Sequence, residues 1–285
     1  MKTIIDGKEV IMSEEQVLQM PPLLEWEEVI NPGRFKGKTI IVTGAGSGIG
    51  RAAASRIVRE GGTVVGVDLN PEGLEELGGV LANDSTEGVG EFIAVTADVT
   101  SNEDIARVYE AVGERKLDGL VNNAGIMDGF IPLHELQDDW YEKIMAVNVG
   151  SVVKMTRPAL QKMMAQNDGA IVNVASLAGI SGGAAGTAYT TSKHAMIGLT
   201  RNAALLYRKH NIRVNAVAPG GTITNVDGQF RSAYTGETLG PIMQGAGTRM
   251  ASAELVAANI IYLLLDEAKN ITGVTLASAD GWNAI

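Results

Sequence analysis

Short apolar runs alternate with longer amphipathic stretches along most of the chain, beginning at residue 39. The runs are apolar throughout, as expected of strands whose two faces are both buried. Between them, apolar side chains recur at the spacing of a helix face. This pattern predicts an α/β domain with a doubly wound parallel β-sheet of about seven strands flanked by helices. The predicted strands span residues 39–43, 63–68, 92–96, 119–123, 170–174, 213–217 and 274–277, and the predicted helices span 51–60, 102–113, 138–166 and 253–265.

Two segments fall outside this pattern. Residues 1–35 form an acidic N-terminal extension, which we interpret as a packing arm on the main domain or on another subunit. Within it, Ser13–Gln16 resembles a capping box and predicts a short helix that Pro21-Pro22 would end. Residues 222–250 lack clear periodicity and contain five glycines, so we expect a mobile substrate loop there. The main domain, residues 36–285, shows no internal linker.

Composition and charge narrow the classes of function. Apolar residues make up 45% of the 285 residues, which is typical of a globular protein. No run of about 18 apolar residues occurs, and the first residues do not resemble a secretory signal, so we expect no membrane association. The absence of cysteine excludes disulfides and thiolate chemistry and fits a cytoplasmic protein. The net charge of −10 argues against nucleic acid as a partner, because phosphate backbones repel an acidic chain.

A glycine-rich loop, Thr43–Gly50 with the sequence TGAGSGIG, joins the first predicted strand to the first predicted helix. Such a turn lets backbone N–H groups and the N-terminus of a helix meet a pyrophosphate. The common dinucleotide fingerprint GxGxxG does not fit, because Ile49 occupies its last position. The loop fits the pattern TGxxxGxG instead, which still predicts a dinucleotide site.

Asp68 ends the second predicted strand, 24 residues after Gly44. A carboxylate at this place can accept hydrogen bonds from both adenosine ribose hydroxyls and would repel a 2′-phosphate. Ser47 and Leu69 stand where a basic residue would favour NADP. The sequence therefore predicts NAD as the cofactor.

Tyr189 and Lys193 are four residues apart, so on a helix they share one face. An ammonium group beside a phenol favours the phenolate, which would lower the pKa of Tyr189 and make it usable as an acid or base. A lone YxxxK is a weak signal. Its occurrence downstream of the glycine loop, Asp68, Asn148 and Ser176 makes it specific and indicates a nicotinamide-dependent oxidoreductase.

In combination, TGxxxGxG, an NNAG motif at Asn122–Gly125, Ser176 and the YxxxK at Tyr189–Lys193 resemble the short-chain dehydrogenase/reductase (SDR) family over roughly residues 36–281. The resemblance implies a single-domain Rossmann fold, a homotetramer packed through the long helices, and a tyrosine acid/base assisted by a serine, a lysine and a water held by an asparagine. The catalytic positions it implies here are Asn148, Ser176, Tyr189 and Lys193. The cofactor-binding positions it implies are Gly44, Ser47, Gly48, Ile49, Gly50, Asp68, Leu69, Asp98, Val99, Asn123, Ala124, Gly125, Tyr189, Lys193, Pro219, Gly220, Thr222 and Thr224.

The substrate is less well defined by the sequence than the chemistry. Residues Gly182–Gly186, just before Tyr189, carry almost no side-chain volume and leave room for a bulky secondary alcohol such as a steroid or another alicyclic compound. The main hypothesis is an NAD(H)-dependent oxidoreductase that interconverts such an alcohol and its ketone. The alternatives are a 3-oxoacyl-thioester reductase and a non-catalytic nucleotide-binding protein. The three histidines show no metal-ligand spacing, so we expect no metal.

Overall fold

A parallel sheet of seven strands organises the part of the chain that the computed structural model describes, which comprises residues 2–5, 8–11, 23–225, 229–246 and 249–284. The predicted sheet is confirmed, and each predicted strand is present. In spatial order the strands are β5 (Glu91–Thr96), β4 (Thr63–Asp68), β3 (Thr39–Thr43), β6 (Gly119–Asn122), β7 (Gly169–Val174), β8 (Ile212–Pro219) and β9 (Thr275–Ser278).

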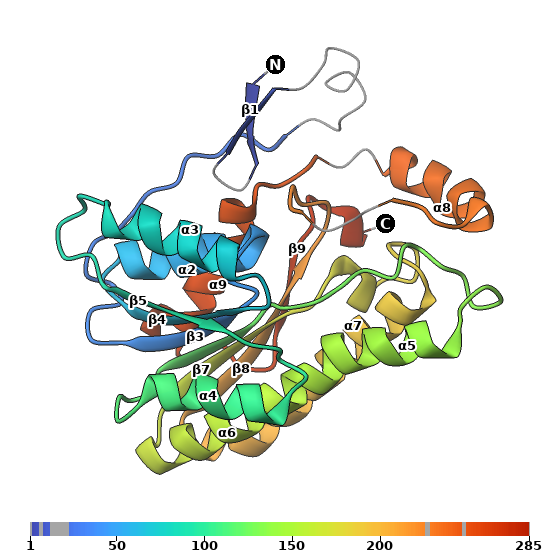
Figure 1. Cartoon of the computed structure of the whole chain (residues 1–285). Coiled ribbons are helices and arrows are strands. Elements are labelled where there is room, and N and C mark those ends of the chain that lie inside the picture. The colour runs from blue at the N-terminus through green and yellow to red at the C-terminus, as the bar shows by residue number, and fades with distance from the viewer. Residues whose placement is uncertain (1, 6–7, 12–22, 226–228, 247–248, 285) are drawn as a thin grey trace.

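Helices cover both faces of the sheet (Figure 1). On one face, α2 (Gly48–Arg59), α3 (Pro71–Ala82) and α9 (Ala253–Leu264) pack in a continuous apolar core with the inner strands. On the other face, α4 (Asn102–Val112), α6 (Ser151–Gln166) and α7 (Thr187–Tyr207) bury a second core, and α5 (Asp138–Met145) lies along α7. The short helical turns are η1 (Ala146–Gly150), η2 (Leu177–Gly179), η3 (Arg208–His210), η4 (Asp266–Ala268) and η5 (Trp282–Ala284). No helix in the described ranges is long and apolar enough to cross a membrane.

The strand order reverses at β3, which pairs with β4 on one side and with β6 on the other. All five residues of β3 are buried, because it lies in the middle of the sheet with helices on both sides. In doubly wound sheets, ligands bind beyond the carboxyl ends of the strands at such a reversal. The topology therefore directs attention to the loops after β3 and β6.

The helical stretch predicted over 138–166 is interrupted in the structure. Between α5 and α6, residues Ala146–Gly150 form a π-helical turn instead of an α-helical one. A π turn accommodates one extra residue and changes the direction in which side chains point, and such turns are frequent at functional sites. Periodicity alone did not reveal this turn, because apolar spacing is nearly the same through it.

The region expected to be an irregular loop contains a helix, α8 (Ala233–Gly245). The Ser232 side chain begins it by accepting a hydrogen bond from Thr235 N (3.3 Å). Three glycines and Pro241 within the helix obscure its periodicity, because they are poor helix formers. The expectation of a loop over 222–250 is therefore wrong for the residues of α8, and the mobility of this segment stays a prediction. Residues 226–228 and 247–248 lie outside the described part.

The N-terminal extension begins with an antiparallel hairpin of β1 (Lys2–Ile5) and β2 (Lys8–Ile11), which the sequence did not predict. The capping box at Ser13–Gln16 lies outside the described residues. From residue 23 the extension follows the C-terminal end of α2, where Glu28 pairs with Arg59 (3.0 Å) and Arg34 with Glu60 (2.7 Å). Leu24 N also donates to Met250 O (2.9 Å), so this segment touches the end of the region that carries α8.

Candidate active site

Four predicted side chains meet beyond the carboxyl ends of β6 and β7. Tyr189 and Lys193 lie on the first turns of α7, Ser176 follows β7, and Asn148 lies in η1. The Nζ atom of Lys193 is 5.3 Å from the centre of the Tyr189 ring, so the helix places both on one face as predicted. The structure thus brings together residues that are up to 45 positions apart in the chain.

Lys193 is almost completely buried, with 3% of its surface exposed. Its Nζ donates a hydrogen bond to the carbonyl of Val174 (2.9 Å), at the end of β7. Burial lowers the pKa of this ammonium to about 8, because removal from water disfavours the charged form. A Cβ atom on Gly125 would lie 3.2 Å from Asn148 Oδ1, closer than an ordinary contact, which favours glycine as the last residue of the NNAG motif.

The Tyr189 phenol behaves differently from the sequence expectation. Burial raises its pKa to about 12, and the hydrogen bond with Ser176 lowers the pKa by less than burial raises it. The predicted lowering of the pKa by Lys193 is therefore wrong for the chain by itself. The physical reason is that the ammonium lies over the ring rather than at the hydroxyl and is bonded to Val174 O, while desolvation acts on the phenolate directly.

Asn148 is fully buried and uses its whole amide group within the protein. Its Oδ1 accepts a hydrogen bond from Ile126 N (2.9 Å), and its Nδ2 donates to Ile126 O (2.9 Å) and to Ser192 Oγ (3.1 Å). Ser192 in turn donates to Tyr189 O (2.7 Å). Asn148 in the π turn thus ties the loop after β6 to α7.

The glycine loop after β3 is shaped by close approach of backbone to backbone. Gly44 and Gly48 have positive φ angles of 68° and 52°. A Cβ on Gly50 would collide with the carbonyl of Gly44, so only glycine allows α2 to start here. Ser47 at the N-cap makes no side-chain cap, and the first turn holds no acidic residue. The positive end of a helix without an acidic residue in its first turn is a common place for an anion to bind.

Asp68, at the end of β4, faces this loop. Its Oδ2 accepts a hydrogen bond from Gly46 N (2.9 Å), and its Oδ1 accepts one from Asn70 N (2.9 Å). Leu69, the next residue, is 67% exposed and contributes no charge. Arg51, which directly follows the glycine loop in sequence, forms an ion pair with Glu76 (3.3 Å).

The residues predicted to bind adenosine lie after the ends of β5 and β6. Asp98 Oδ1 accepts hydrogen bonds from the N–H and hydroxyl of Thr100 (both 2.7 Å), and Val99 is buried beside it. Asn123 N and Ala124 N both donate to Thr43 Oγ1, at 2.9 and 3.1 Å. These bonds hold the first residues after β6 against the end of β3.

The segment after β8 closes the other side of the predicted cofactor site. Gly220 N donates to Ser278 O (2.9 Å), which fixes the turn after Pro219 to β9. Thr222 pairs with Ala251 in an isolated parallel bridge. A Cβ on Gly48 would lie 3.2 Å from the Thr224 methyl carbon, so this segment reaches the glycine loop. Ile49, by contrast, packs into the core beneath α2.

Sequence analysis missed one site residue, Asp128. It is completely buried, and its Oδ2 accepts a hydrogen bond from the backbone N–H of Tyr189 (2.9 Å). No periodicity or spacing marks it, because an aspartate in a loop is ordinarily a turn residue. The signal that could have found it is its distance of only three residues from the NNAG motif.

A recess of about 320 Å³ lies beside the N-terminal end of α7. Its walls come from Pro132, from the small residues before Tyr189 and from α8, and include Gly182, Ala185, Gly186, Tyr234 and Leu239. The recess has the low side-chain volume that the sequence predicted for this region.

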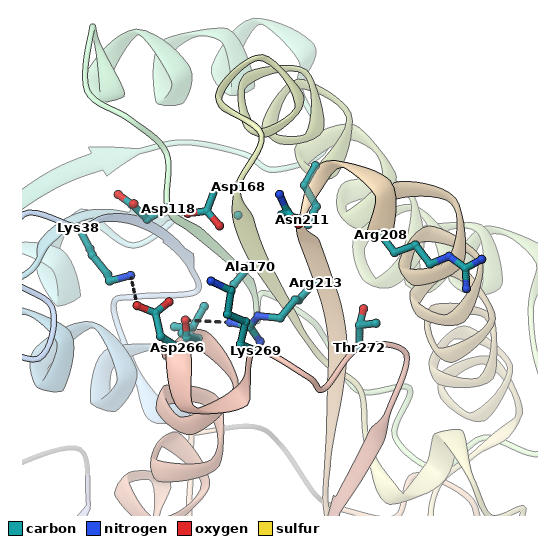
Figure 2. Close-up of a pocket in the computed structure, with 13 residues that line it drawn as sticks. Lys38, Asp118, Asp168, Ala170, Arg208, Asn211, Arg213, Asp266, Lys269 and Thr272 are labelled. Carbon is teal, nitrogen blue, oxygen red and sulfur yellow. Dashed lines mark hydrogen bonds and ion pairs between the residues drawn. The ribbon is translucent and has the colours of Figure 1, made fainter.

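A second recess lies at the opposite, amino end of the sheet (Figure 2). Its charged groups serve the fold: Arg213 donates to the carbonyls of Leu263 (2.6 Å) and Leu264 (3.1 Å), at the end of α9. Lys38 lies 3.6 Å from Asp266, and Asp118 accepts a hydrogen bond from Thr39 N (2.8 Å). Within the described residues, no group of three or more potential ligands could hold a metal ion.

Comparison with known proteins agrees with this geometry. A family model described as short chain dehydrogenase matches residues 38–235. The chain is similar to 3beta-hydroxysteroid dehydrogenase 2 of Eggerthella lenta, with 37% identity over 254 residues that cover 87% of this chain and 95% of that protein.

Among solved structures, it resembles levodione reductase, with a TM-score of 0.79, 30% identity and coverage of 88% of this chain and 99% of the other. It also resembles an NAD-bound 3-oxoacyl-[acyl-carrier protein] reductase from Brucella melitensis, with a TM-score of 0.78, 26% identity and coverage of 91% and 98%. The chain belongs to the short-chain dehydrogenase/reductase family of nicotinamide-dependent oxidoreductases.

Proposed function

We propose that this protein interconverts a bulky, apolar secondary alcohol and its ketone with NAD(H). The observation that carries the proposal is the meeting of Ser176, Tyr189 and Lys193 beyond the carboxyl end of β7, beside a glycine loop built for an anion. The hydroxysteroid dehydrogenase relative and the space before Tyr189 support the substrate class.

The residues present fit a nicotinamide dinucleotide. The Ser47 side chain does not cap α2 and the first turn holds no acidic residue, so the positive end of the helix dipole would suit a pyrophosphate there. Asp68 would hold the adenosine ribose, Asp98 and Val99 the adenine, and Asn123–Gly125 the ribose nearby. Pro219, Gly220, Thr222 and Thr224 would contact the nicotinamide side. When bound, this cofactor supplies or accepts the hydride.

The chain's own residues handle the proton and the substrate oxygen. The Tyr189 hydroxyl donates a proton to the ketone oxygen in reduction and accepts one from the alcohol in oxidation. The Ser176 hydroxyl donates a hydrogen bond to the same oxygen and stabilises charge developing there. The buried Lys193 ammonium, which donates to Val174 O in the structure, would bind a ribose hydroxyl of the cofactor, and its positive charge would favour the phenolate. Asn148 has no free amide hydrogen, so a water relay at this position would use its backbone carbonyl.

Cofactor preference tests the role of Asp68. We expect kcat/KM to favour NADH over NADPH by at least 100-fold, because a carboxylate repels a 2′-phosphate and no described cation offsets it. Asp68→Asn should reduce kcat/KM for NADH about tenfold, since it weakens charge-assisted hydrogen bonds to the ribose. Steady-state kinetics with both cofactors decide the matter, and a native preference for NADPH contradicts the proposal.

Substrate class is tested by following NADH oxidation over a panel of steroid, other alicyclic and small aliphatic ketones. The expected order of kcat/KM is steroid or alicyclic above small aliphatic. The alternative function, a 3-oxoacyl-thioester reductase, is favoured by the fold similarity to the Brucella melitensis enzyme. Faster turnover of 3-oxoacyl thioesters than of free ketones would establish that alternative.

We also propose a homotetramer packed through the long helices, supported by the exposure of Leu205 (60%) and Leu206 (55%) on α7. The extension before β3 is proposed as a packing arm, supported by its ion pairs with the end of α2. Light scattering at micromolar concentration tests the assembly, and a monomeric mass contradicts it.

A further inference from the structure

The carboxylate of Asp128 is a buried acidic group next to Tyr189 that the proton-transfer scheme leaves unused. It is 0% exposed and lies in the segment between β6 and α5. Its Oδ1 accepts a hydrogen bond from Phe130 N (3.0 Å), and its Oδ2 accepts one from Tyr189 N (2.9 Å). A buried carboxylate with two backbone donors from different segments is held in one place.

The N-terminus of α7 depends on this carboxylate. The N-cap residue of the helix is Gly186, which has no side chain to accept a hydrogen bond. Asp128 supplies the missing acceptor from another segment, and its negative charge suits the positive end of the helix dipole. A Cβ on Gly186 would lie 2.6 Å from Asp128 Oδ2, so only glycine lets the two segments approach this closely.

The same loop contacts the segment that precedes α8. Arg231 N donates to Gly129 O (2.9 Å), and the rings of Phe130 and Phe230 lie 4.4 Å apart. Phe130 has a φ of 58°, a left-handed conformation that is unfavourable for an aromatic residue and needs support from its surroundings. The hydrogen bond to Asp128 Oδ1 provides that support.

We infer that Asp128 is a positioning residue. It holds the backbone of Tyr189 so that the phenol stays beside Ser176, and it couples Tyr189 to the Phe230–Arg231 segment before α8. The expected effect on the reaction rate rests on the proposed function. The expected effect on the position of the Tyr189 backbone rests only on the contacts above. Rate depends on this placement, because a shift of about 1 Å at a reacting group can cost 100-fold.

The charge of Asp128 adds a second, separable effect. The charged groups that face Tyr189 in the described structure are Lys193 on its own helix and Asp128 from the loop after β6; η1 and the turn after β7 contribute the uncharged Asn148 and Ser176. The negative charge of Asp128 raises the pKa of Tyr189. Removing that charge should therefore shift the pH dependence of alcohol oxidation toward lower pH.

The test compares the full-length wild type with Asp128→Asn and with a matched control, Asp118→Asn. Asp118 also accepts a backbone hydrogen bond, from Thr39 N, but lies at the amino end of the sheet.

We expect Asp128→Asn to lower kcat about 10- to 100-fold, to leave the dissociation constant for NADH within twofold, and to move the pH of half-maximal oxidation downward. Asp118→Asn should lower Tm while leaving kcat and the pH profile unchanged. Wild-type kcat and an unmoved pH profile in Asp128→Asn would overturn the inference.

Two further measurements keep the test decisive. If Asp128→Asn does not fold, Gly186→Ala displaces the same contact while keeping the charge, and it should lower kcat without moving the pH profile; full activity overturns the inference. If the wild type reduces no ketone, the proposed function fails, and amide hydrogen exchange decides about Asp128 by itself. Faster exchange than in the wild type over residues 186–190 of Asp128→Asn, with unchanged exchange over 201–207, supports the positioning role. Exchange equal to that of the wild type in both regions overturns it.

Discussion

The two ends of the sheet both collect polar side chains, but they use them in opposite ways. At the carboxyl end, the helices begin, and the first turn of α2 has neither a cap from the Ser47 side chain nor an acidic residue. At the amino end, the helices finish, and the Arg213 side chain donates to carbonyls at the end of α9. The difference follows from the direction of the strand–helix unit, since N–H groups are orphaned at one helix end and C=O groups at the other.

This comparison explains why a charged recess need not be a binding site. The guanidinium of Arg213 donates to three carbonyls at the end of α9, which takes up three of its five N–H donors. The first turn of α2, by contrast, has no cap from the Ser47 side chain and no acidic residue, so its positive end can face an anion. Substitutions at the carboxyl end should therefore remove activity with little loss of stability, and those at the amino end should do the reverse.

The largest expected effect is that of Tyr189→Phe. Loss of the acid/base hydroxyl should lower kcat about 1,000-fold, within the range for general acid–base catalysis. The dissociation constant for NADH and Tm should change little, which fluorescence titration and thermal unfolding measure. Tyr109→Phe is the matched control, because the Tyr109 hydroxyl donates to Met155 O far from the site and should affect stability only. Retention of a tenth of wild-type kcat in Tyr189→Phe would refute the assigned role.

Arg213→Met should produce the largest loss of stability. It leaves three carbonyls at the end of α9 without their donor, and we expect a decrease of about 3 kcal/mol in the free energy of unfolding. The expected kcat per folded molecule is that of the wild type. Arg208→Met, an exposed residue lining the same recess, serves as control and should be nearly neutral. A loss of kcat without a loss of stability would break the contrast between the two ends.

Much of the carboxyl end could be predicted from sequence, because its chemistry is local. The glycine loop, Asp68 and the Tyr189–Lys193 spacing each lie within one strand–turn–helix unit or one helical turn. Their approach in space then follows from the parallel topology. The catalytic tyrosine's pKa could not be predicted, because desolvation depends on what surrounds the phenol rather than on the residue four positions away.

The features that escaped prediction depend on distant contacts or on exceptions to a period. Asp128 gains its role only through Tyr189 N, 61 residues further along the chain. The π turn around Asn148 disturbs the helical period by a single residue. The helix α8 is hidden by its glycines and Pro241, and its N-cap at Ser232 becomes meaningful only once Thr235 N is seen to donate to it.

The lowered pKa of Lys193 predicts a pH-dependent stability in the absence of cofactor. The pKa falls from 10.5 in the unfolded chain to about 8 in the folded protein, so between these values the unfolded chain binds a proton that the folded chain does not. The free energy of unfolding therefore rises with pH in this window. Tyr189, with its pKa raised from 10.0 to about 12, acts in the opposite direction only above pH 10.

We therefore expect the wild type to gain about 2 kcal/mol relative to Lys193→Met between pH 8 and pH 10, at 1.36 kcal/mol per pKa unit. Urea unfolding at the two pH values measures this difference. Lys162→Met, which removes a partly exposed lysine that donates to Gly113 O, is the control and should follow the wild type. A difference between wild type and Lys193→Met that is independent of pH would contradict the burial of an ammonium at the carboxyl end.

The smallest effect is expected at the amino end, at the ion pair of Lys38 and Asp266. The two charged atoms are 3.6 Å apart and the Asp266 side chain is 80% exposed, so water screens their attraction. Asp266→Asn should lower the free energy of unfolding by less than about 1 kcal/mol, and less still at high salt. A double-mutant cycle with Lys38→Met at low and high salt measures the coupling. A coupling of several kcal/mol, or a change in kcat, would mean that the amino end does more than hold the helix ends in place.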